Sequence, residues 1–118
     1  GTINTISDGY ALMLYKIRTT YPNAQVYCFT SLEGRTVSGD TTYPIVNSAG
    51  DTIHEVNHAI TEIAHIFGCK VIDLNTCGIH YWNISSFTTD GTLHPNERGQ
   101  KVIKETAKQE LINEFHNI

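Results

Sequence analysis

The 118-residue sequence lacks the features that would point to a membrane or a nucleic acid as its partner. No apolar run approaches the ~20 residues that a membrane-spanning helix requires. The eight lysines and arginines form no cluster, twelve acidic residues outnumber them, and the net charge is −4. Because nucleic acids and anionic membranes bind basic patches, the sequence argues against both as partners.

The sequence also lacks repeats, low-complexity tracts and a visible signal peptide, and it indicates no compartment. Its hydrophobic content of 40% with 17% charged residues is ordinary for a globular protein, which argues against disorder. The length allows one domain and no more.

Cysteine is scarce, with three residues that cannot all pair within one chain. Cys69 and Cys77 flank an apolar run, and eight extended steps of ~3.3 Å would place them too far apart for a disulfide. A turn at 75–76 would weaken that argument. Cys28 lies in another apolar run, where a buried thiol is usual. None has an activating neighbour in the sequence, so we expect three free, non-catalytic thiols.

The apolar periodicity predicts the order helix, strand, helix, strand, helix. The predicted elements are a helix capped by Thr5 or Ser7 and ended by Tyr21, a strand over 25–30, a helix that starts in a capping box at 48–51 and stops at Gly68, a strand over 69–74, and a helix over 95–116. Long loops over 31–49 and 75–89 separate them. This order indicates an α/β fold with parallel strands flanked by helices. Two strands would leave both edges of the sheet open, so we expect a preceding segment or a second copy of the chain to complete it.

The segment DGTLHPN at 90–96, followed by Gly99, carries the strongest chemical signal. A histidine is the side chain best suited to take and return a proton near neutral pH, and a nearby carboxylate can fix its tautomer. His94 and Asp90 are therefore candidate catalytic residues. The alternative is a helix N-terminus, with Pro95 at the first helical position and Asp90 as a loop acceptor.

This segment resembles the last conserved block of the SGNH (GDSL-type) hydrolases, a D-x-x-H-P-N stretch that opens the C-terminal helix. The stretch YPNAQV at 21–26 and the segment 57–74 resemble the preceding blocks in the same order. In this sequence three residues separate Asp90 from His94, where the family has two. The resemblance implies a three-layer flavodoxin-like fold and a serine ester hydrolase without metal or organic cofactor, in which His94 takes the serine proton and Asp90 orients His94.

The resemblance does not extend to the family's G-D-S nucleophile turn or its oxyanion residues. The stretch SGDT at 38–41 lacks the apolar strand that should present the serine, and it lies too close to His94. Residues 1–4 match the asparagine block poorly. We therefore expect 1–118 to be the C-terminal part of a single SGNH-like domain, inactive by itself. The implied substrate is a small-molecule ester of a lipid or a carbohydrate.

A second motif, His54-Glu55-x-x-His58, matches the zinc-protease signature. At ~100° per residue, however, these histidines and His65 lie away from the apolar stripe of their helix, beside Glu62. A catalytic zinc needs a cleft and a third ligand, and no extended metalloprotease pattern follows. A solvated helix face that at most chelates stray metal is the favoured interpretation, and a zinc hydrolase is the weaker alternative.

Three further features allow more than one interpretation. Tyr81 and Trp82 could rim a pocket, although a core role is favoured because aromatic residues dominate core area. Asp73 ends a predicted strand where α/β folds place ligands, or it caps a loop. The rival to the hydrolase as a whole is a non-catalytic α/β interaction module.

Overall fold

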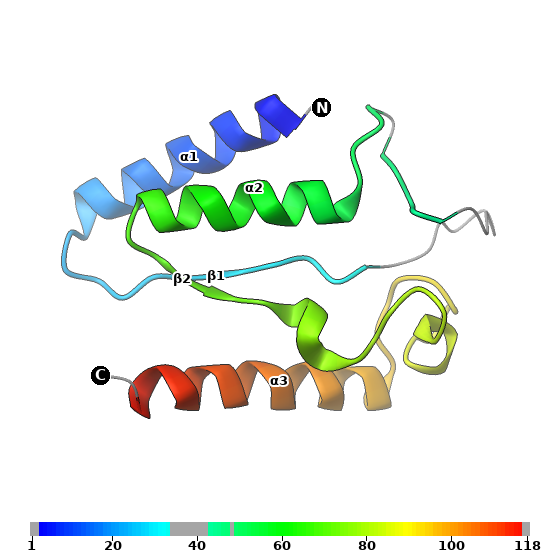
Figure 1. Cartoon of the computed structure of the whole chain (residues 1–118). Coiled ribbons are helices and arrows are strands. Elements are labelled where there is room, and N and C mark those ends of the chain that lie inside the picture. The colour runs from blue at the N-terminus through cyan, green and yellow to red at the C-terminus, as the bar shows by residue number, and fades with distance from the viewer. Residues whose placement is uncertain (1–2, 34–42, 48, 117–118) are drawn as a thin grey trace. The chain divides into compact units, whose positions relative to one another are not determined.

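A computed structural model describes residues 3–33, 43–47 and 49–116 of the chain. Its elements are the α-helices α1 (Ile3–Thr20), α2 (Ile53–Ile66) and α3 (Glu97–His116), the strands β1 (Tyr27–Phe29) and β2 (Lys70–Ile72), and the 3₁₀ helices η1 (Leu74–Cys77) and η2 (Ile84–Ser86) (Figure 1). Among the described residues, β1 and β2 form a small parallel sheet. The predicted α/β class and the order of helices and strands are confirmed.

The chain divides into two compact units. The first unit comprises residues 1–30 and 46–71, and in it α1 and α2 pack against each other. Its core contains five buried residues, together with half-buried side chains such as Val26 and Val71. The buried members are Leu14, Cys28, Ile63, Ala64 and Cys69. These residues come from both helices and from the strand segments, so α1 and α2 cover one face of the sheet.

Both strands are shorter than predicted. The backbone N–H of Lys70 donates to Val26 O at 2.9 Å, which fixes the register of the parallel pair. Side chains alternate between faces, so Cys28 points into the core while Phe29 is 47% exposed. Phe29 therefore lies on the face turned away from this core.

The helix starts differ from the predictions. Because α1 already includes Ile3, Thr5 and Ser7 lie inside the helix and neither caps it. Thr52, not the 48–51 segment, is the N-cap of α2: its side chain accepts from Glu55 N–H, and the Glu55 carboxylate accepts from Thr52 N–H. Ser48 itself lies outside the described residues. The Asn47 side chain accepts two backbone N–H groups at 49 and 51, which makes that segment a turn before the helix.

The far ends of both helices follow the predictions more closely. Helix α2 stops before Gly68, whose φ of +69° is the left-handed conformation that glycine adopts most readily. Arg18, in the last turn of α1, donates from Nε to Phe67 O at 2.9 Å and from Nη1 to Ala24 O at 2.8 Å. This guanidinium ties the end of α1 to the end of α2.

The second unit comprises residues 31–45 and 72–118, and in it α3 packs against η1. The segment predicted as an irregular loop over 75–89 contains most of η1 and all of η2. Its apolar side chains Ile79, Tyr81 and Ile84 are buried. Throughout the described part of the chain, no helix combines the length and the apolar character that a membrane crossing would need.

Candidate functional site

The candidate site is a short turn that precedes α3. Thr88 and Pro95 form an isolated antiparallel bridge, and Thr89 N–H donates to His94 O at 2.8 Å. Gly91 lies inside the turn with a φ of +77°, a conformation that is strained for most other residues. Backbone hydrogen bonding thus holds the two sides of the turn together and brings Asp90 and His94 close to each other.

Both carboxylate oxygens of Asp90 are engaged within this turn. Oδ1 accepts from the backbone N–H groups of Thr92 at 3.0 Å, Leu93 at 2.8 Å and His94 at 3.2 Å. Oδ2 lies 2.6 Å from Nδ1 of the His94 ring. The predicted pairing of the acid with the histidine is therefore present in the geometry. The extra residue between them, which departs from the family pattern, is accommodated by the turn.

The environment of Asp90 favours its charged form. The backbone N–H groups of Leu93 and Thr92, followed by the His94 ring, hold the pKa of Asp90 well below its usual range. A carboxylate facing Nδ1 favours the imidazole tautomer with its proton on that nitrogen, which leaves the lone pair on Nε2. The pair is thus arranged to present a basic nitrogen to an incoming proton donor.

The turn does not bury this pair. The His94 side chain is 74% exposed and that of Asp90 is 33% exposed. A histidine that acts on a substrate must keep Nε2 accessible, and here the described residues leave it open. Around the pair, the described residues form no enclosed cleft.

Asn96 and Gly99 fix the start of α3. The Asn96 side chain accepts from Gly99 N–H at 2.9 Å, and Asn96 N–H donates to Phe87 O at 2.9 Å. Asn96 therefore acts as the helix N-cap. Pro95 precedes the helix, so the prediction that it occupies the first helical position is wrong. A Cβ on Gly99 would overlap Phe87 O, so only glycine permits this approach.

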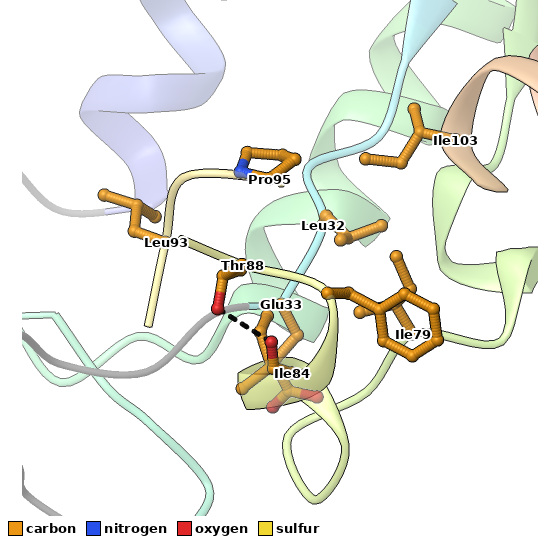
Figure 2. Close-up of a pocket in the computed structure, with 9 residues that line it drawn as sticks. Leu32, Glu33, Ile79, Ile84, Thr88, Leu93, Pro95 and Ile103 are labelled. Carbon is orange, nitrogen blue, oxygen red and sulfur yellow. Dashed lines mark hydrogen bonds between the residues drawn. The ribbon is translucent and has the colours of Figure 1, made fainter. Parts of the chain in front are cut away.

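A small apolar pocket also lies in the second unit (Figure 2). Leu93 and Pro95, the sequence neighbours of His94, are among its lining residues, which do not include His94 or Asp90. The lining residues are Leu32, Glu33, Ile79, Ile84, Phe87, Thr88, Leu93, Pro95 and Ile103. The same short segment thus carries the Asp90–His94 pair and part of the pocket wall.

The second motif has a structural role in α2. His54, His58 and His65 are exposed, as predicted for a solvated face. Glu55, which would be the base of a zinc protease, instead completes the capping box with Thr52. Within the described ranges, no group of three or more His, Cys, Asp or Glu side chains is placed to hold a metal ion.

The structure resolves the alternatives for Tyr81, Trp82 and Asp73. Tyr81 is 5% exposed, which confirms a core role, but Trp82 is 64% exposed, so that prediction is wrong for Trp82. Trp82 packs instead on Tyr43, with ring centroids 4.6 Å apart. Asp73 accepts from Asn75 N–H at 3.0 Å and caps η1, which confirms the loop-cap interpretation. The SGDT stretch at 38–41, which weakly resembles the family's nucleophile turn, lies outside the described residues.

All three cysteines are free thiols, as predicted. Cys28 and Cys69 are buried in the first unit, whereas Cys77 is half-buried at the end of η1 in the second unit.

Comparisons with known proteins identify a fold but no family. No protein-family profile matches the chain, and no curated protein matches it in sequence. A structural-genomics crystal structure of a protein from Lactobacillus plantarum superimposes with a TM-score of 0.79 at 18% sequence identity. The match covers 92% of this chain and 53% of that one, so the chain spans about half the length of the similar protein. At this identity the likeness shows the fold alone.

Proposed function

We propose that this chain supplies the general base and its orienting acid to a serine ester hydrolase of the SGNH type. The finer architecture belongs to the same proposal: the chain would form part of a three-layer flavodoxin-like domain, with parallel strands flanked by helices. The observation that carries the proposal is the 2.6 Å contact between Asp90 Oδ2 and His94 Nδ1, with Oδ1 of the same carboxylate fixed by three backbone N–H groups.

In the proposed reaction, a serine from outside this sequence attacks the carbonyl carbon of an ester. His94 Nε2 takes the serine proton and returns it to the leaving alcohol, which yields an acyl-enzyme that water cleaves with the same histidine as base. Asp90 keeps the Nδ1 proton in place and stabilises the imidazolium that forms. This chemistry requires no metal or organic cofactor. By resemblance, the substrate is a small-molecule ester of a lipid or a carbohydrate.

The geometry favours this proposal over a non-catalytic interaction module. A purely structural turn would be closed by Oδ1 alone, because that oxygen already accepts all three backbone N–H groups. The second oxygen is directed at a histidine ring that is largely exposed. Such an arrangement orients a ring whose outer nitrogen is accessible, which a module that only binds a partner does not need.

The test uses the protein that contains this chain, with p-nitrophenyl acetate as substrate and a fluorophosphonate to label the nucleophilic serine. We expect His94→Ala to abolish both turnover and labelling. Asp90→Asn should lower kcat by roughly 10⁴-fold, as removal of the orienting charge does in other serine hydrolases. Residues 1–118 alone should hydrolyse the ester no faster than buffer.

Matched controls separate loss of chemistry from loss of fold. Asp73→Asn removes another aspartate that caps a turn in the same unit, and His80→Ala removes another exposed histidine. Both variants should retain turnover within a few-fold. Full ester hydrolysis in folded His94→Ala would contradict the proposal. A protein that never reacts with the fluorophosphonate and never turns over ester would favour the interaction module.

A further inference from the structure

An aromatic cluster in the second unit has no part in the proposed ester chemistry. It consists of Tyr43, Tyr81 and Trp82, which come from two segments of that unit. The ring centroid of Tyr43 lies 5.1 Å from that of Tyr81 and 4.6 Å from that of Trp82. The centroids of Tyr81 and Trp82 are 5.5 Å apart, and these two rings meet edge to face. The three rings therefore form one packed group in which each contacts the other two.

Burial divides this cluster into a base and an outer surface. Tyr81 is 5% exposed and anchors the cluster, whereas Tyr43 is 39% exposed and Trp82 is 64% exposed. Because their rings pack on each other, Tyr43 and Trp82 present adjoining aromatic surface to solvent. Single exposed apolar side chains are common on protein surfaces, but a contiguous exposed patch marks an interaction site or a ligand site.

Hydrogen bonds hold the backbone that carries Tyr81 and Trp82. The Asn83 side chain accepts from His80 N–H at 2.8 Å through Oδ1 and donates from Nδ2 to Gly78 O at 2.9 Å. Asn83 N–H also donates to His80 O at 3.1 Å, which closes the turn around both aromatic residues. A tryptophan that is held by neighbouring rings on a closed turn loses little side-chain entropy when it binds a ligand. The outer surface of the cluster is therefore preorganised.

The segments that carry the rings indicate an uncharged ligand. Residues 43–47 and 74–89 include no Asp, Glu, Lys or Arg, whereas phosphate groups and nucleic acids bind through basic side chains. A cation would need space between the rings, but these rings already pack on one another. The second segment is instead rich in hydroxyl and amide side chains, and Ser85 and Ser86, shortly after Trp82, are exposed. Aromatic surface beside uncharged hydrogen-bonding groups suits a neutral sugar.

We propose that Tyr43 and Trp82 form a binding platform for an uncharged, β-linked glucan oligosaccharide. In β-linked glucose the ring substituents are equatorial, so the axial C–H groups give each sugar ring a flat apolar face. That face stacks on the exposed indole ring of Trp82, with Tyr43 extending the contact. The equatorial hydroxyls point outward from the stack, where serine hydroxyls can exchange hydrogen bonds with them. This binding requires no ester bond and no turnover, so it is independent of the proposed hydrolysis.

The experiment titrates cellohexaose into the protein that contains this chain and measures binding by isothermal titration calorimetry. We expect Trp82→Ala to weaken binding by about tenfold or more, because truncation of a tryptophan at the centre of a contact removes most of the contact area. Tyr43→Ala should weaken binding less, and Trp82→Phe, which keeps an aromatic ring, should retain part of the affinity. Tyr21→Ala removes a tyrosine of the first unit that is 63% exposed, and it should leave the affinity unchanged.

A second measurement uses residues 1–118, in which Trp82 is the only tryptophan. Acrylamide should quench the fluorescence of Trp82, and saturating cellohexaose should protect it from the quencher and shift its emission to the blue. Absence of cellohexaose binding by the wild-type protein would overturn the proposal, as would binding that Trp82→Ala leaves unchanged. Binding of neutral phosphatidylcholine vesicles without binding of cellohexaose would also overturn it, since the two rings would then serve a membrane surface.

Discussion

Gly99→Ala tests the close approach between the start of α3 and the backbone of Phe87, which lies next to the candidate site. Gly99 lies in the first turn of α3, where the helix meets the backbone of Phe87. A methyl group there would overlap Phe87 O and would lie 3.2 Å from Phe87 C and 3.3 Å from Pro95 Cβ. The first two are backbone atoms and cannot rotate away, so the helix start and the Phe87 segment must separate.

The expected loss of stability combines three contributions. Forcing an extra methyl group into a packed site costs about 1–3 kcal/mol. The separation also breaks the bond from Asn96 N–H to Phe87 O, which contributes about 1 kcal/mol. Replacement of glycine by alanine inside a helix returns about 1 kcal/mol of helix propensity. We therefore expect Gly99→Ala to lower the free energy of unfolding by about 1–3 kcal/mol.

Gly9→Ala provides the matched control. Gly9 lies in the interior of α1 and is exposed, and a methyl group added there would meet no atom within 4 Å. The same change should therefore raise the free energy of unfolding by up to about 1 kcal/mol. Urea titration followed by circular dichroism measures both values, and amide hydrogen exchange assigns the loss in Gly99→Ala to residues 86–100. Equal stabilisation by the two substitutions would show that Gly99 does not meet Phe87 in solution.

Three further predictions test separate parts of the structure. Thr52→Ala removes the N-cap of α2 and should lower the free energy of unfolding in urea by about 1 kcal/mol; no change would mean that the capping box is not formed in solution. Leu14→Ala, at a core position 2% exposed, should cost about 2–5 kcal/mol in the same assay, whereas Leu12→Ala, 54% exposed, should stay within about 0.5 kcal/mol. The folded pKa of Asp90 lies below its ordinary value of 3.8, so its stabilising charge is fully present above that pH and is lost only as pH falls through the lower, folded pKa. The carboxyl carbon shift of Asp90 should therefore still report the ionised form at about pH 3, and half-protonation near pH 4 would contradict this.

The order of helices and strands was predictable because it depends on local periodicity. The ends of the elements were not, since several side chains could cap each helix. Thr52 and Glu55 form the capping box of α2, although the spacing at 48–51 resembles one equally well. The Asn47 side chain accepts hydrogen bonds from the backbone N–H groups at 49 and 51, so that segment forms a turn and the helix starts after it. Hydrophobic periodicity does not reveal these bonds.

The pairing of Asp90 with His94 was predictable from their spacing and from the family resemblance. The three backbone donors to Asp90 were not, because they depend on how the turn closes around Gly91. Nothing in the sequence indicated that Gly99 meets Phe87, since that approach depends on the tertiary path of the chain. An N-cap at Asn96 could be predicted from its residue type, but it places only the N–H of Gly99 and not Phe87.

The most direct test of the Asp90–His94 pair is the nitrogen-15 NMR spectrum of the His94 imidazole at a pH where the ring is neutral. We predict a proton on Nδ1 and a lone pair on Nε2, with a shift toward the Nε2-protonated tautomer in Asp90→Asn. A wild-type ring that is already protonated on Nε2 would contradict the claim that Asp90 orients His94 as a base.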